Sequence, residues 1–186
     1  MKFKALFSFI LSISCLFAIG AQGSRTENMN VANLIQSRLP SLGHRNWIVV
    51  ADSAYPLQVS AGVETITVNE DQLSVVKEVL NALAKAKHVR PHIYCDAEMD
   101  FVSPKNAPGI TGYKKSLTGL LKGKSVDKML HEQIIAKLDE AGKTFKVLLI
   151  KTPLTVPYTS VFFQLECGYW SDAAEKEMRE AMQKGG

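Results

Sequence analysis

The sequence predicts a single α/β domain built around a mostly buried sheet. Short apolar runs of strand length, such as WIVVA at 47–51, alternate with amphipathic stretches of helical length. An unbroken apolar run of five residues is typical of a strand covered on both faces. Strands that alternate with amphipathic helices indicate a sheet packed against helices. The composition agrees, because 46% hydrophobic and 22% charged residues in 186 are typical of a globular protein.

The segment from residue 24 to about residue 100 is expected to hold two helices and three strands. Val31, Leu34 and Ile35 have the three-and-four spacing of a helix. Asn69 is expected to cap the second helix, with Gln72 at the capping-box position. In order, the elements are a helix at 28–39, strands at 47–51 and 64–68, a helix after residue 69 and a strand at 92–95.

The second half is expected to begin with an irregular excursion or flap over 103–124, which is rich in Pro, Gly, Ser and Lys. A helix from about Val126 to Ala141 follows, and Gly142 is expected to end it. Strands are expected at 145–150 and 161–165, and a polar helix at about 171–183.

The N-terminus is typical of a cleaved export signal. Lys2 and Lys4 form a basic start, and an apolar run follows at 5–19. Ala21 and Gly23 fit the −3 and −1 positions of a signal-peptidase site. A transmembrane anchor is the less favoured alternative, because a bilayer-spanning helix needs about 20 apolar residues. We therefore expect a signal peptide at 1–23 and a mature domain at 24–186, which is periplasmic or secreted and not attached to the membrane.

Charge and motifs exclude several classes of function. The formal charge is +4, and removal of the two lysines of 1–23 leaves +2. A net charge this small does not indicate binding to nucleic acid. Neither a dinucleotide nor a Walker A motif is present, nor a nucleophile elbow. We expect no cofactor and no metal. Cys95 and Cys167 lie in or beside apolar runs, so they are either buried thiols or a disulfide.

Asp52 and His44 are the first candidates for chemistry. Asp52 directly follows the most apolar strand, and ligands of open α/β sheets bind beyond the carboxyl ends of strands. His44 comes eight residues earlier, before a strand that spans roughly 17 Å. The two side chains therefore meet only if the strand bends or a second subunit supplies one of them. Taken alone, each residue is better explained structurally: Asp52 as a helix cap or turn cap, and His44 as a solvated loop histidine.

Five further side chains are weaker candidates. Asp96, Glu98 and Asp100 alternate, so on a continued strand they would share one face and could serve acid–base or cation chemistry. A solvated strand end is the favoured interpretation of these three acids. Tyr158 lies in a loop before a strand, where a phenol can stack on a sugar or form a hydrogen bond with it; a purely structural role is the alternative. For His131, an ordinary surface histidine is the default interpretation.

Two segments together resemble one known family. LGH at 42–44, the strand after it and DSAYP at 52–56 are similar to the opening of the D-ribose pyranase / L-fucose mutarotase (RbsD/FucU) family. Lys151-Thr152 and PYTS at 157–160 resemble the family's R-[ST]-G-E…P-Y-A-N ending. Glu98 resembles the family's acid after the third strand. His131 resembles its H-E-[EQ] histidine, with an insertion before Tyr158.

The resemblance implies a three-layer α/β/α sandwich and interconversion of sugar anomers or ring forms without a cofactor. It makes His44 the acid–base group, with Asp52 orienting it or binding sugar hydroxyls. It also implies a ring of identical subunits, commonly a decamer, in which a neighbour completes each site. The sugar-binding residues it implies are Tyr158, Ser160, His131 and Glu98.

This sequence departs from the family at two motif positions. Pro153-Leu154 replaces the family's Gly-Glu, and Ser160 replaces its asparagine. The function expected is an exported monosaccharide mutarotase or pyranase, acting on a sugar such as L-fucose or D-ribose. The alternative is a non-catalytic exported sugar-binding module on the same fold, and a third option is an interaction protein that keeps only the ring scaffold.

Overall fold

The structure is a computed structural model that describes residues 30–185. Its helices and strands, in chain order, are α1 (Val31–Arg38), β1 (Trp47–Ala51), β2 (Val63–Thr67), α2 (Gln72–Lys85), β3 (Val89–Asp96), α3 (Ile110–Leu120), β4 (Val126–Met129), α4 (His131–Thr144), β5 (Val147–Lys151), β6 (Val161–Cys167) and α5 (Asp172–Gly185). Two 3₁₀ helices, η1 (Leu39–Ser41) and η2 (Ala97–Phe101), follow α1 and β3.

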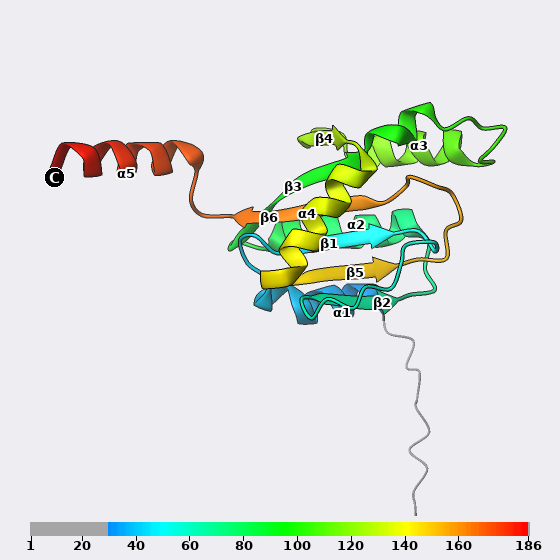
Figure 1. Cartoon of the computed structure of the whole chain (residues 1–186), viewed down its shortest axis with the longest axis horizontal. Coiled ribbons are helices and arrows are strands. Elements are labelled where there is room, and N and C mark those ends of the chain that lie inside the picture. The colour runs from blue at the N-terminus through cyan, green and yellow to red at the C-terminus, as the bar shows by residue number, and fades with distance from the viewer. Residues whose placement is uncertain (1–29, 186) are drawn as a thin grey trace, which may run out of the picture.

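The six strands form one mixed sheet in the order β2-β5-β1-β6-β3-β4. β5 is parallel to β1 and β2, and β3 is parallel to β4. β6 is antiparallel to both of its neighbours, β1 and β3. β1 to β5 therefore all point the same way, as the arrows in Figure 1 show for β1, β5 and the reversed β6. The carboxyl ends of five strands and the start of β6 meet at one edge.

Alternation along the strands divides the core between two faces. Ile48 and Val50 of β1 pack into a cluster with side chains of α1, α2 and α3. Val49 of the same strand packs on the other face with Ile134 and Leu138 of α4, and all five side chains are 0% exposed. Successive side chains of a strand point to opposite faces, so an apolar run is needed where both faces are covered. The predicted three-layer α/β/α sandwich with a mostly buried sheet is confirmed (Figure 1).

Helix α2 begins two residues later than predicted. The side chain of Asp71, not Asn69, caps it, accepting a hydrogen bond of 3.0 Å from the Ser74 amide. Gln72 is therefore the first helical residue, and it is 1% exposed rather than part of a capping box.

The segment predicted as a flap over 103–124 contains α3, so that prediction was wrong. Ile110, Tyr113 and Leu117 have helical spacing, and they are buried in the larger core cluster. The lysines and glycines between them mask this periodicity because they occupy the solvent face.

The prediction of a helix from Val126 to Ala141 was wrong about the first turn and about the end of the helix. Residues 126–129 form β4, which pairs with β3, and the helix starts only at His131. Gly142 lies inside α4 and is buried, and a Cβ there would be 3.0 Å from Val63 and 3.3 Å from Ser60. The glycine allows a close approach of the chain rather than ending the helix.

The remaining elements agree with the prediction to within three residues at each end. Helix α5 has no buried side chain and projects away from the sheet (Figure 1). The predicted signal peptide at 1–23 lies outside the described residues. Within residues 30–185, no helix has the length and apolarity needed to cross a membrane.

Candidate functional site

The common edge of the sheet gathers polar side chains from distant parts of the chain. Asp52 follows β1, Asp96 ends β3, His131 follows β4, Thr152 follows β5 and Ser160 precedes β6. This is the edge where ligands of open α/β sheets bind.

At this edge, His131 and Asp96 form a hydrogen-bonded pair. The Nδ1 atom of His131 lies 3.0 Å from Oδ1 of Asp96. The His131 side chain is 36% exposed, whereas Asp96 is fully buried. A histidine held through Nδ1 by a carboxylate has a fixed orientation and presents Nε2 for chemistry. Among the described residues, the second oxygen of Asp96, Oδ2, has no hydrogen-bond partner.

Burial raises the pKa of Asp96 to about 6. The hydrogen bond and charge of His131 act in the opposite direction, whereas the charges of Glu98 and Asp52 add to the increase. Burial raises the pKa of a carboxyl group because the charged form loses its hydration. Asp96 therefore changes protonation close to neutral pH, in direct contact with His131.

Glu98 fixes the start of α4. Both of its carboxylate oxygens accept from the backbone N–H of His131, at 3.0 Å each. The residue at the N-cap position, Leu130, offers no side-chain cap, so Glu98 satisfies a helix N–H that would otherwise be free. Glu98 thus positions His131, and the sugar contact predicted for it stays a prediction.

Tyr158 lies beside the His131 ring in a strained backbone conformation. The two ring centroids are 5.6 Å apart with an interplanar angle of 85°, an edge-to-face contact. The φ angle of Tyr158 is +57°, a region that costs a non-glycine residue about 1–2 kcal/mol. Such strain is concentrated at functional sites. The Tyr158 side chain is 39% exposed, so it forms an accessible wall next to His131.

A buried network behind the site holds the loop that carries Tyr158. Gln72 donates from Nε2 to the carbonyl of Thr159 at 2.6 Å and accepts at Oε1 from Thr152 at 2.9 Å. The hydroxyl of Tyr113 also donates to the Thr159 carbonyl, at 2.6 Å. The network connects α2 and α3 with the chain between β5 and β6, and so fixes the position of Tyr158.

Asp52 and Ser160 lie at the same edge in different environments. The Oδ1 atom of Asp52 accepts from the Ala54 amide at 2.9 Å, which is the turn-capping role considered above. Asp52 is nevertheless half-buried and close enough to Asp96 for its charge to raise the pKa of Asp96. Ser160 is 1% exposed. The sugar contacts predicted for both residues stay predictions.

His44 lies at the opposite edge of the sheet, before the start of β1. β1 pairs with β5 at all five of its residues, so the strand is regular and does not bend. His44 and Asp52 therefore do not meet within one chain. His44 is exposed and lines a cavity of about 470 Å³ with Glu166 and Trp170. The expectation that a second subunit brings His44 to Asp52 stays a prediction.

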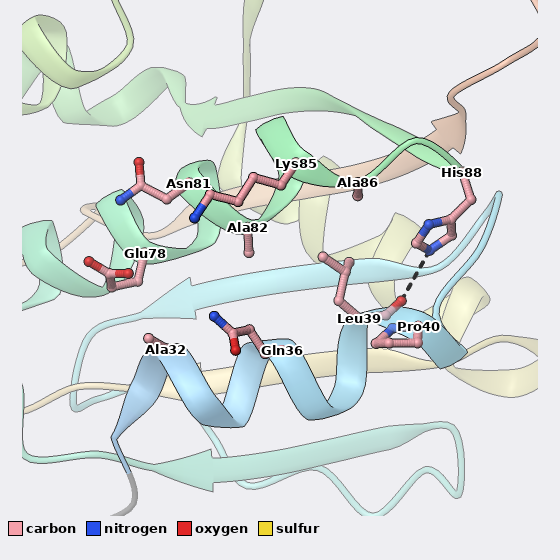
Figure 2. Close-up of a pocket in the computed structure, with 10 residues that line it drawn as sticks. All are labelled: Ala32, Gln36, Leu39, Pro40, Glu78, Asn81, Ala82, Lys85, Ala86 and His88. Carbon is pink, nitrogen blue, oxygen red and sulfur yellow. Dashed lines mark hydrogen bonds between the residues drawn. The ribbon is translucent and has the colours of Figure 1, made fainter.

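A different cavity, of about 460 Å³, lies between α1 and α2 (Figure 2). The His88 ring stands at one end of this groove, and its Nε2 is 3.2 Å from the Leu39 carbonyl and 3.1 Å from that of Leu42. Both partners only accept, so Nε2 carries the proton and His88 ties two loops together. This groove is lined by residues of 32–40 and 78–88, none of which belongs to the site at the strand edge.

The two cysteines of the described region are free thiols. In the β3–β6 pair, Cys95 lies opposite Val161 and Cys167 lies opposite Val89, at opposite ends of the ladder. Burial raises the pKa of the Cys95 thiol to about 12. Among residues 30–185, no cluster of three or more His, Cys, Asp or Glu side chains has a metal-binding arrangement.

Sequence reasoning named Asp96 only as one of three alternating acids and gave Gln72 and Tyr113 no role in a site. The three acids would share a strand face only if the strand continued. Instead β3 ends at Asp96 and η2 follows, so Asp96 and Glu98 reach His131 from different directions. The signal available was position: Asp96 directly follows the strand predicted at 92–95, as Asp52 directly follows the strand predicted at 47–51.

Comparison with known proteins gives matches among solved structures only, since the sequence matches no family model and no curated protein. RbsD of Bacillus subtilis, solved with D-ribose, is 21% identical over 77% of this chain and 95% of that chain, with a TM-score of 0.49. The fucose mutarotase of Streptococcus pneumoniae, solved with L-fucose, is 18% identical over 74% and 93%, with a TM-score of 0.48. FucU of Bifidobacterium longum is 12% identical over 70% and 91%, with a TM-score of 0.44.

These proteins bear the names of the family whose motifs the sequence resembles. The case for a function rests on the residues of the site.

Proposed function

We propose that this chain is an exported monosaccharide mutarotase or pyranase, which interconverts the anomers or ring forms of a sugar such as L-fucose or D-ribose. The observation that carries the proposal is the hydrogen bond between His131 and the buried Asp96, beside the exposed ring of Tyr158. The family-like motifs around Asp52 and Tyr158 supply the class of reaction.

The chemistry needs one base and one acid at the anomeric centre. The base removes the proton of the anomeric hydroxyl, its O–H electrons form the carbonyl, and the bond from the anomeric carbon to the ring oxygen breaks. The acid delivers a proton to that ring oxygen, and the open aldehyde recloses on its other face. An imidazole suits either step near neutral pH.

We assign the base to Nε2 of His131. Its Nδ1 proton is held by Asp96, whose negative charge stabilises the imidazolium formed when Nε2 takes the hydroxyl proton. Tyr158 packs against the sugar ring, and Asp52 binds sugar hydroxyls from the end of the neighbouring strand. No step in this scheme uses a cofactor.

His44 enters the site in this proposal from a second copy of the chain, where it serves as the acid. Two apolar side chains at the ends of elements that carry the site favour such an assembly, because they are exposed: Phe101 at the end of η2, at 88%, and Leu130 directly before α4, at 52%. Exposed apolar groups around a polar site are typical of a surface that another protein covers. The proposed assembly is a homo-oligomeric ring of the kind that the resemblance implies.

Saturation-transfer proton NMR between the anomeric signals of D-ribose and of L-fucose tests the proposal. These are the sugars bound in two of the solved structures above. We expect wild-type residues 24–186 to accelerate exchange, and His131→Gln to lower the rate by a factor of about 10²–10⁴, the usual contribution of a positioned acid–base group. His92→Gln is the matched control, since His92 lies on the same sheet four residues before Asp96. Exchange at the rate of buffer alone with both sugars, or equal rates for wild type and His131→Gln, would contradict the proposal.

A non-catalytic sugar-binding module is the second candidate. Leu154 in place of the family's glutamate and the burial of Ser160 favour it, because both remove polar groups from the expected sugar contacts. This candidate predicts saturable sugar binding with anomer exchange no faster than in buffer, so the same NMR samples separate the two functions.

A further inference from the structure

A cavity of about 700 Å³ lies between α3 and β4, on the sheet face opposite α4. β4 is the outermost strand, and its register places Val126 opposite Ile93 and Lys128 opposite Cys95. Cross-strand partners share a face, so Val126 and Lys128 project toward α3 together with Cys95. The volume falls within the range of small-molecule sites, roughly 300–1,000 Å³.

The floor of this cavity is apolar. It is formed by Cys95, Met99, Leu117, Leu121 and Val126. The first four are at most 8% exposed, and Val126 is half-buried against the same core cluster. A floor of this kind favours hydrocarbon. The hydroxyl of Thr118, which also lines the cavity, already donates to the Lys114 carbonyl at 2.8 Å.

The rim carries an excess of positive charge. Four lysines line it, Lys114, Lys115, Lys122 and Lys128, against one carboxylate, Asp100. Asp100 pairs with Lys128, and its backbone carbonyl accepts from Lys114 at 3.3 Å. Within residues 30–185, neither Lys115 nor Lys122 has a carboxylate at ion-pair distance. The rim therefore has uncompensated charge directly above an apolar floor.

We propose that this cavity binds an amphiphilic anion, an unbranched aliphatic carboxylate of medium length. The alkyl chain lies against the apolar floor, and the carboxylate is held by the lysine rim. A small polar anion would leave the floor unused, and a neutral or cationic amphiphile would meet the lysines without a partner. The inference is independent of the proposed sugar chemistry, because none of these residues belongs to the site around His131.

Titration with decanoate, followed by NMR of methionine ¹³C-methyl groups, tests the proposal. Met99 lines the cavity, so its methyl signal is the reporter, and Met99→Leu assigns it. We expect a saturable shift of this signal below the concentration at which decanoate forms micelles. Octanoate should bind about 15-fold more weakly, which corresponds to the loss of two methylenes at about 0.8 kcal/mol each. Decylamine should leave the signal unchanged.

Variants distinguish a specific binding site from non-specific binding of the alkyl chain. Lys115→Gln/Lys122→Gln should weaken decanoate binding about tenfold, since each removed lysine is a charge-assisted partner. Lys137→Gln, an exposed lysine of α4, is the control and should have no effect. His131→Gln should bind decanoate as wild type does, whatever its effect on sugar exchange. Equal affinity for decylamine, the absence of a chain-length dependence, or unchanged binding by the double lysine variant would overturn the proposal.

Discussion

The unusual pKa of Asp96 makes the stability of the protein depend on pH in a specific direction. Burial raises this pKa from 3.8 to about 6, so the folded state holds the proton more tightly than the unfolded state. Between pH 4 and pH 6 the folded protein therefore binds more protons, and the contribution of Asp96 to stability falls as the pH rises through this window. Below pH 4 the contribution is fully present, and above pH 6 it has been lost.

The magnitude follows from the size of the shift. One pKa unit corresponds to about 1.4 kcal/mol, so the stabilisation lost from pH 4 to pH 7 is about 2–3 kcal/mol. Asp96→Asn removes the titration and keeps the shape of the side chain. We expect the stability of wild type relative to Asp96→Asn to decrease by this amount as the pH is raised.

Urea unfolding of both proteins at pH 4, 5, 6 and 7 measures this difference, because the titration of all other groups largely cancels between them. Glu132→Gln, at an exposed position on α4 next to His131, serves as the control and should show a change below about 0.5 kcal/mol over the same range. A difference that is independent of pH, or one that grows in favour of wild type toward pH 7, would refute the reasoning. The latter result would mean that Asp96 is an ordinary ion-paired carboxylate with a lowered pKa.

Three further variants test the packing of the fold and the support of the site. Leu138→Ala should lower the free energy of unfolding by about 2–5 kcal/mol in urea titrations, because Leu138 is fully buried between α4 and the sheet; a loss below 1 kcal/mol would argue against that packing. Gly62→Ala should cost about 1–3 kcal/mol in the same assay, since its Cβ would collide with the backbone carbonyls of Gly142 and Phe145. Gln72→Leu should cost about 1–3 kcal/mol and also slow anomer exchange, because the Thr159 carbonyl loses one of its two side-chain donors and Thr152 keeps only the Ala51 carbonyl as an acceptor; a variant with full stability would contradict the role given to this network.

The sequence was sufficient for the layers of the fold but not for all of its elements. The run at 47–51 is apolar at every position because both faces of β1 are covered, and this pattern is visible without a structure. Helix α3 was missed because its apolar positions are separated by Lys, Ser and Gly on a solvent face, so composition outweighed periodicity. The short β4 was missed because a four-residue edge strand leads almost directly into α4.

The site was predicted in part for a similar reason. Single residues such as Asp52 and Tyr158 could be selected from strand ends and motif likeness. The pairing of His131 with Asp96 depends on β3 and β4 being adjacent and parallel, which local sequence does not encode. Gln72 lies at the start of a helix, where only the fold reveals that it faces the core rather than solvent.

The measurement that tests the central claim most directly is the rate of anomer exchange catalysed by wild type and by Asp96→Asn, followed from pH 5 to pH 8. With Asp96 as the group that orients His131, the wild-type rate should rise through about pH 6 as Asp96 ionises, and the variant should be slower by a factor of about 10² or more, without that rise. Equal rates for the two proteins across this range would contradict the claim that the His131–Asp96 pair carries the chemistry.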